Sequence, residues 1–286
     1  MRLDNSRESS NVEDRRGRRM SVGGRGKIGL GTIVLALVAI YFGVDPNVVL
    51  QNMTEPAETE TSYSTPGGTA PPTAETRFVS KVLADTEDTW GAIFQKKGWG
   101  TYQQPKLVLF SGATPTACGT GQSAMGPFYC PGDSKVYLDL SFFQQMAQEL
   151  KSPGDFAQAY VIAHEIGHHV QHLAGITDQV DQMRRRVSAT AANQLSVKVE
   201  LQADCFAGIW AKHSDTQRAT LEQGDIEEAL NAATAIGDDR LQQQSQGYVV
   251  PDSFTHGSSA QRVRWFTRGF QSGDPAQCDT FKATSL

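Results

Sequence analysis

The chain has 286 residues, of which 39% are hydrophobic, and its formal net charge is −5. This length and apolar content suit one or two globular domains. Residues 1–27 carry 8 basic and 4 acidic side chains, whereas residues 28–286 carry 18 basic and 27 acidic ones. Because so acidic a body repels phosphates, the composition excludes nucleic acid as an expected partner.

The first 44 residues predict a membrane anchor. Residues 1–27 are rich in Arg, Gly and Ser, so we expect a basic, disordered cytoplasmic segment. Residues 28–44 carry no charge and would span roughly 25 Å as a transmembrane helix. Positive charge before this span predicts a single-pass membrane protein with its main domain extracytoplasmic. A buried core helix and a cleaved signal peptide are the alternatives, although Val44-Asp45-Pro46-Asn47 offers no small-residue cleavage site.

Beyond the anchor, residues 45–75 are dense in Pro, Ser, Thr and Glu, a composition typical of a linker. Residues 76–286 are expected to form one folded domain. Its first part predicts a helix from about residue 78 to 94 that ends before Gly98, and strands at residues 106–110 and 135–140. Ser141 is expected to cap a short helix. Residues 136–140 are our candidate for the sheet edge along which a peptide substrate pairs.

The C-terminal half of the domain predicts mainly helices. Asp155 is the expected N-cap of one helix, which stops at Gly175, and Asp225 is the expected N-cap of another, over residues 225–236. A further helix is expected over residues 196–212. Ser258 and Gln261 form a capping box that opens the last helix, and residues 242–246 are too polar to assign.

Four cysteines, Cys118, Cys130, Cys205 and Cys278, allow three disulfide pairings. An oxidising compartment would favour such bridges. Pairing Cys118 with Cys130 would close a short Gly-rich loop, and pairing Cys205 with Cys278 would tie the C-terminal tail to the core. No C-x-x-C spacing occurs, so a cysteine zinc site is not expected.

The pattern His164-Glu165-x-x-His168 lies within an apolar, helix-predicting stretch. Residues four apart share one face of a helix, so His164 and His168 can bind a single Zn²⁺ ion. Glu165 lies about 100° round the helix, beside the ion rather than on it. It is therefore placed to take a proton from a water molecule held there.

A catalytic zinc usually has three protein ligands. His172 continues the line of His164 and His168, but positions i, i+4 and i+8 span about 12 Å, too far for one ion. The metzincin pattern is also excluded, because Gln171 and Ala174 stand where Gly and His are required.

Glu200 is the better third ligand. Glu200 and Asp204 share one face of a predicted helix whose other positions are largely apolar. Because a buried carboxylate without a partner is costly, the apolar surroundings favour metal binding over two solvated acids. We expect Glu200 to bind the metal and Asp204 to accept the second N–H of a ligand histidine.

These residues resemble known families. His164-Glu-x-x-His168 followed by Glu200-x-x-Ala203-Asp204 is similar to the gluzincin arrangement, in which Glu is the third ligand. The combination also resembles the bacterial putative neutral zinc metallopeptidase family, over about residues 77–281. The segments that carry this resemblance are Cys118-Gly, Gly126-Pro-Phe-Tyr-Cys-Pro, Val136-Tyr-Leu-Asp, His164-Glu-Ile-Gly-His-His-Val-Gln, Glu200-Leu-Gln-Ala-Asp-Cys-Phe-Ala-Gly and His256-Gly-x-x-x-x-Arg262. The resemblance implies a zincin-like α+β domain and marks His164, Glu165, His168 and Glu200 as site residues.

The sequence therefore predicts a membrane-anchored zinc metallopeptidase that acts on a peptide or protein substrate. Glu165 would be the general base, and His256, with Tyr248 behind it, would stabilise the oxyanion. A zinc-stabilised envelope scaffold without peptidase activity is the alternative, and a non-peptide hydrolase on a zincin core is another. Glu165 favours hydrolysis, because a structural zinc site needs no carboxylate beside the metal.

Overall fold

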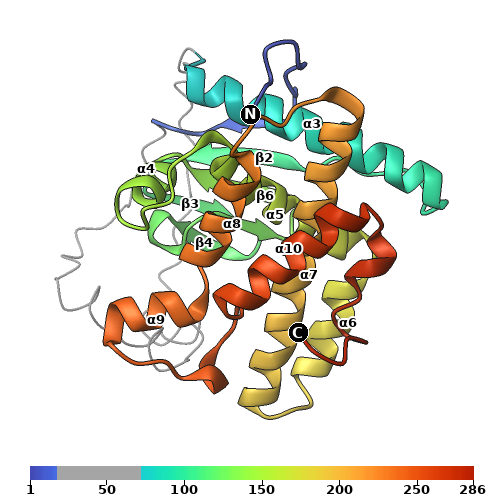
Figure 1. Ribbon diagram of the computed structural model, residues 1–286. Coiled ribbons are helices and arrows are strands. Elements are labelled where there is room, and N and C mark those ends of the chain that lie inside the picture. The colour runs from blue at the N-terminus through green and yellow to red at the C-terminus, as the bar shows by residue number, and fades with distance from the viewer. Residues whose placement is uncertain (18–71) are drawn as a thin grey trace, which may run out of the picture. The chain divides into compact units, whose positions relative to one another are not determined.

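The computed structural model describes residues 1–17 and 72–286, and residues 1–17 form one compact unit with the chain from Pro71 onwards. Helices dominate this unit and a small sheet accompanies them, which confirms the α+β class (Figure 1). The helices are α3 (Ala74–Lys97), α4 (Ser141–Gln148), α5 (Asp155–Leu173), α6 (Ile176–Arg184), α7 (Ala189–Arg218), α8 (Asp225–Ala235), α9 (Asp238–Gln246) and α10 (Ser259–Ser272), with short 3-10 turns η1 (Ser123–Met125), η2 (Pro251–Ser253) and η3 (Pro275–Cys278). The strands are β1 (Val12–Asp14), β2 (Lys106–Phe110), β3 (Ala113–Thr116), β4 (Gly119–Gln122), β5 (Phe128–Cys130) and β6 (Lys135–Asp139).

The main sheet has the order β1-β2-β6-β5, with β1, β2 and β6 parallel and β5 antiparallel to β6. After Lys106, strand β2 is apolar because both of its faces are covered: Leu107 and Leu109 join the main core, and Val108 and Phe110 join a smaller cluster. Strand β6 lies inside the sheet. The prediction that residues 136–140 form a free edge is therefore wrong, and the edge strand beside α5 is β5.

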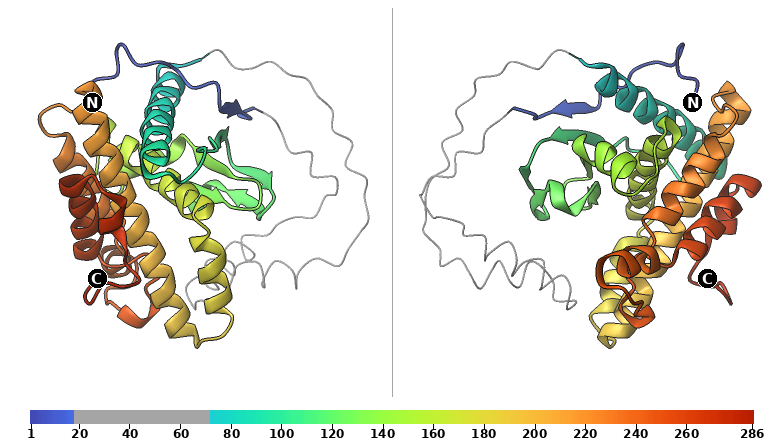
Figure 2. Two further views of the ribbon diagram at one scale, coloured as in Figure 1. Left: turned by 90° about the vertical axis from the view of Figure 1, so that its right-hand side faces the viewer. Right: turned by 60° about the vertical axis from the view of Figure 1, so that its left-hand side comes forward.

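The N-terminal segment packs on this sheet, so the prediction of disorder for residues 1–27 is wrong for residues 1–17 (Figure 2). Strand β1 pairs in parallel with β2. On α3, the buried carboxylate of Glu87 accepts hydrogen bonds from Ser9, Asn11 and Arg7. Composition does not reveal this docking, because the polar segment finds its partners more than 70 residues further along the chain.

Several predicted helix ends are confirmed. Helix α3 ends at Gly98, which takes the left-handed conformation with φ 68°, and Ser258 and Gln261 form the capping box of α10. Asp155 and Asp225 are not N-caps. They are the first residues of α5 and α8, each preceded by a glycine, and the Asp155 carboxylate instead binds the α-amino group of Met1 at 2.9 Å.

Other local predictions also differ from the structure. Ser141 begins α4 without capping it through its side chain, and the polar residues 242–246 belong to α9. Among the described residues, no helix is both long enough and apolar enough to cross a bilayer. The predicted anchor at residues 28–44 and nearly all of the predicted linker lie outside the described residues.

Helices α7 and α10 lie side by side and share the most extensive contact between elements of the described residues (Figure 1). A Cβ atom on Gly269 would lie 1.9 Å from the backbone oxygen of Cys205, and one on Gly208 would lie 2.1 Å from that of Phe266. Glycine at both positions lets the two backbones touch. Both expected disulfides are present: Cys118–Cys130 beside the β3–β4 hairpin, and Cys205–Cys278 between α7 and η3.

Candidate metal centre

The centre lies where α5 crosses α7, at a pair of small residues. A Cβ atom on Gly167 would lie 3.0 Å from both the Cα and the oxygen of Ala203. Because no side chain separates the helices there, the histidines one turn apart on α5 can reach the carboxylate of Glu200 on α7. Gly167 stands inside the His164–His168 pattern, and Ala203 stands three residues after Glu200.

Three side chains converge at this crossing. The Nε2 atom of His164 lies 3.1 Å from Glu200 Oε2, and the Nε2 atom of His168 lies 3.5 Å from Glu200 Oε1. One ligand atom from each of the three residues falls within 4.8 Å of the others. Tetrahedral bonds of about 2.1 Å require ligand atoms about 3.4 Å apart, so these three side chains fit a zinc ion.

The charges of the centre also suit a cation. The two ring nitrogens of His164 each face a carboxylate, Asp204 on one side and Glu200 on the other. Burial alone would lower the pKa of His164, but these two carboxylates raise it to about 10. Burial would raise the pKa of Glu200, yet the charge of His168 and hydrogen bonds from both histidines hold it well below its usual range. The centre therefore attracts positive charge, which a divalent metal can supply.

Asp204 fixes the orientation of His164 as expected. Its Oδ1 atom lies 2.8 Å from His164 Nδ1, and its side chain is fully buried. The guanidinium of Arg262 donates to both Asp204 oxygens at 2.9 Å, and the hydroxyl of Tyr160 donates to Oδ1 at 2.5 Å. Burial would raise the pKa of Asp204, but Arg262 and His164 hold it below its usual value. The carboxylate therefore stays charged inside the core.

Glu165 follows His164 on α5 and is only 7% exposed. Its carboxylate lies close enough to His168 to favour the charged form of that imidazole. Within the described residues, no hydrogen bond or ion pair occupies the Glu165 side chain. A buried carboxylate thus lies beside the converging ligands without a bonding partner in the part of the chain that the structure describes.

His256 lies next to the same centre, on the loop between η2 and α10. A Cβ atom on the following residue, Gly257, would contact Leu201 and Val197 of α7, which flank Glu200 in sequence. A hydrogen bond to Asp238 and the charge of Glu200 raise the pKa of His256. Its imidazole is 53% exposed, so the ring borders both the ligand cluster and the solvent.

Asp238 holds this loop in place. One carboxylate oxygen accepts the backbone N–H groups of Thr255, His256 and Gly257 at 2.7, 2.7 and 3.1 Å, and the other lies 3.2 Å from His256 Nδ1. Because Nδ1 is occupied, Nε2 is the nitrogen that remains available to a ligand.

The neighbouring histidines serve other purposes. His169 points away from the ligands, with Nε2 donating to the Gln103 carbonyl at 2.6 Å and Nδ1 lying 2.9 Å from the Tyr129 hydroxyl. Burial lowers the pKa of His169 to about 4. His172, excluded by distance from the sequence, does not join the ligand cluster.

Four residues around the centre received no role from the sequence: Tyr160, Gln171, Asp238 and Arg262. Arg262 could have been found from the sequence. It lies one turn before Phe266 on the apolar side of α10, and a charged side chain there predicts a buried partner of opposite charge. No sequence pattern indicated a role for Asp238, since it begins α9, which is too polar to be assigned as a helix from the sequence.

The chain is similar to a known family and to proteins of other bacteria. The chain matches the family model described as "Putative neutral zinc metallopeptidase" over residues 1–281, which includes the N-terminal segment that the sequence motifs left out. Uncharacterized protein YpfJ of Escherichia coli strain K12 is 55% identical over 289 residues, covering 98% of this chain and 99% of that protein. Uncharacterized protein Rv2575 of Mycobacterium tuberculosis strain H37Rv is 42% identical over 266 residues, covering 87% and 86%. No solved structure matches the chain.

Proposed function

We propose that this chain, which belongs to the putative neutral zinc metallopeptidase family, hydrolyses peptide bonds in a peptide or protein substrate. The family implies Zn²⁺ as the cofactor. His164, His168 and Glu200 would hold the ion, with Asp204 and Arg262 behind His164. The observation that carries the proposal is the buried carboxylate of Glu165, which has no hydrogen-bond partner among the described residues and follows the ligand His164 on α5.

When bound, zinc supplies a Lewis acid that polarises the scissile carbonyl and lowers the pKa of water. Glu165 accepts a proton from the attacking water as the new C–O bond forms. The same carboxylic acid then delivers this proton to the amine nitrogen as the C–N bond breaks, so the base returns to its starting state.

His256 is suited to stabilise the oxyanion that forms on the carbonyl carbon. Nδ1 donates to the Asp238 carboxylate, and the raised pKa of His256 favours the imidazolium, in which Nε2 also carries a proton and can donate toward the ligand cluster. Asp238 therefore acts as a positioning residue, because it sets both the loop and the ring of His256.

The substrate would extend along β5, in a zincin-like arrangement. Strand β5 pairs with β6 on one side, and no described backbone group pairs with its other side. Tyr129 of β5 contacts His169 of α5, which places this edge beside the helix that carries the ligands. A peptide can therefore add to β5 through main-chain hydrogen bonds.

The substitution Glu165→Gln tests the enzyme against the scaffold alternative. We expect it to lower hydrolysis of a peptide library by about 10²–10⁴-fold while one zinc per chain remains bound. Equal hydrolysis by the wild type and the variant would contradict the role of Glu165. Zinc binding with no hydrolysis by the wild type would favour the scaffold.

We also propose that the domain resides in an oxidising, extracytoplasmic compartment, because both of its disulfides are favoured there. Membrane anchoring through residues 28–44 stays a prediction, and the docking of β1 restricts its topology. A single crossing between residues 17 and 72 would place β1 and β2 on opposite sides of the membrane. We therefore propose that residues 1–17 lie on the same side as the domain, which replaces both the cytoplasmic N-terminus and the single crossing of the predicted anchor.

A further inference from the structure

Two buried glutamines stand behind His168, on the side away from Glu200. Gln171 is 0% exposed and Gln202 is 5% exposed. The Oε1 atom of Gln171 lies 2.9 Å from His168 Nδ1, and its Nε2 atom donates to the Val199 carbonyl at 2.7 Å and to Gln202 Oε1 at 3.1 Å. Gln202 in turn donates from Nε2 to the Cys278 carbonyl at 2.9 Å.

The two backbone carbonyls fix the direction of every bond in this chain of amides. A carbonyl oxygen only accepts, so the amide nitrogens of Gln171 and Gln202 must face Val199 and Cys278. The Gln171 oxygen must then face His168. It follows that Nδ1 of His168 keeps its proton, so Nε2, which faces Glu200, is the nitrogen that can give up its proton and bind a metal.

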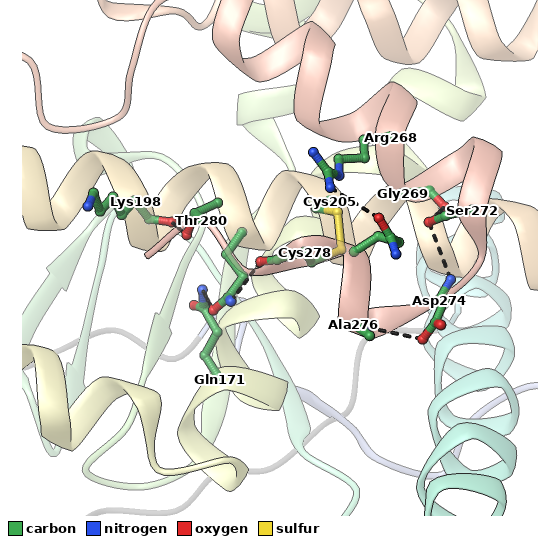
Figure 3. Close-up of a disulfide and its surroundings, with 12 residues drawn as sticks. Gln171, Lys198, Cys205, Arg268, Gly269, Ser272, Asp274, Ala276, Cys278 and Thr280 are labelled. Carbon is green, nitrogen blue, oxygen red and sulfur yellow. Dashed lines mark hydrogen bonds between the residues drawn. A yellow bond between two sulfur atoms is a disulfide. The ribbon is translucent and has the colours of Figure 1, made fainter. Parts of the chain in front are cut away.

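The far end of the chain of amides is anchored by the C-terminal tail. Cys278 is fully buried and bonded to Cys205 of α7, as Figure 3 shows. Two residues further on, the buried hydroxyl of Thr280 donates to the Lys198 carbonyl of α7 at 2.7 Å. The tail is thus fastened to α7 on both sides of Glu200 in sequence.

We propose that Gln171 and Gln202 form an amide relay that fixes the proton and the orientation of His168. We further propose that the Cys205–Cys278 disulfide acts on the metal centre through this relay. The arrangement contrasts with that of His164, whose orienting partner is the charged Asp204–Arg262 pair. The proposal rests on the metal-binding part of the proposed function and not on peptide hydrolysis.

The first test is the zinc dissociation constant of the full chain, measured by chelator competition. Gln171→Met keeps the size of the side chain and removes its hydrogen bonds, so we expect zinc binding about 10–100-fold weaker. Gln202→Met should weaken binding by a smaller factor. Gln158→Met, on the same helix but outside the relay, is the matched control and should bind zinc as the wild type does.

Substitution of cobalt for zinc distinguishes an effect on the orientation of His168 from a general loss of protein stability. The visible absorption bands of the Co²⁺-loaded protein report the ligand field, so Gln171→Met should shift them and Gln158→Met should not. Circular dichroism identifies any variant that fails to fold, in which case Gln202→Met carries the test. Unchanged zinc affinity and unchanged cobalt bands in folded Gln171→Met and Gln202→Met would overturn the relay.

A double-mutant cycle tests the disulfide. Cys205→Ala/Cys278→Ala should weaken zinc binding several-fold in the wild-type background and much less beside Gln171→Met, because both changes act through one path. Cys118→Ala/Cys130→Ala removes the other bridge and should leave the affinity unchanged. If removal of the disulfide weakened zinc binding by the same factor with and without Gln171→Met, the proposed coupling between the disulfide and the metal centre would be wrong. Absence of zinc from the wild-type protein would instead be a failure of the proposed metal site.

Discussion

Each ligand histidine of the metal centre is bonded through Nδ1 to a second residue. Asp204, paired with Arg262, orients His164, and Gln171 orients His168. The ligand histidines therefore lose little orientational freedom on binding an ion, since their second nitrogens are already bonded. Glu165 has no such hydrogen-bond partner among the described residues. Its carboxylate is therefore available to take a proton, whereas the histidines are held in place to bind the metal.

Substitution of His256 tests the oxyanion assignment. We expect His256→Ala to lower kcat by about 10²–10³-fold with the zinc content unchanged, because only a donor to the reacting oxygen is removed. Steady-state kinetics with metal analysis measures both quantities. His213→Ala, which removes a histidine bonded to the Gly273 carbonyl, should retain full activity. A variant of His256 with wild-type kcat would contradict the role.

At the residue scale, the sequence predicted what lies within one helical turn. Helical spacing placed His164, Glu165 and His168, and the paired acids Glu200 and Asp204. Arg262 and Gln171 were not assigned, because their roles depend on contacts with other helices. No spacing in the sequence shows that an amide on α5 will meet an amide on α7.

At the element scale, glycines set how closely the helices approach. Gly167 brings α5 to α7, and Gly208 and Gly269 bring α7 to α10. The second contact carries Arg262 inward to Asp204, so the packing of α10 determines the surroundings of His164. These glycines are positions where the space, rather than the backbone conformation, requires a hydrogen in place of a side chain.

Two glycine substitutions should have opposite effects on stability. Gly269→Ala would press a methyl group against the Cys205 carbonyl, so we expect a loss of roughly 3 kcal/mol or more, at or above the upper end of overpacked cores. Gly91→Ala, in α3 with no atom within 4 Å of the new Cβ, should gain roughly 0.5–1 kcal/mol. Urea unfolding measures both changes. Equal stability of the two variants would contradict the packing described here.

The elements themselves were partly predictable. Helix α3, strands β2 and β6 and the cap of α10 follow from apolar spacing and capping residues. Strands β1 and β5 are three residues each and contain no pattern of their own, so only their pairing with β2 and β6 defines them. The free edge of β5, along which we place the substrate, was therefore not predictable from the sequence either.

At the scale of the whole molecule, the N-terminal segment decides the topology. Residues 1–17 share hydrogen bonds with α3 and a ladder with β2, so these contacts require that both lie in one compartment. The positive charges before residue 28 alone predict a cytoplasmic N-terminus. That rule considers only the charges beside the apolar run and not the contacts that residues 1–17 make with the folded domain.

Single cysteines on exposed residues test this topology. We expect Asn5→Cys and Lys96→Cys to react equally with a membrane-impermeant maleimide in intact cells or spheroplasts, since the two positions belong to one docked unit. Permeabilised cells provide the control for total reactivity. Labelling of Lys96→Cys alone would restore a cytoplasmic N-terminus and contradict the docking of β1.

The most direct measurement is the zinc content per chain of the purified protein, beside His168→Ala and Glu200→Ala. We predict about one zinc in the wild type and none retained after dialysis in either variant, with all three folded by circular dichroism. A folded wild-type protein without zinc, or a Glu200→Ala variant that keeps it as tightly, would contradict the assignment of His164, His168 and Glu200 as the metal centre.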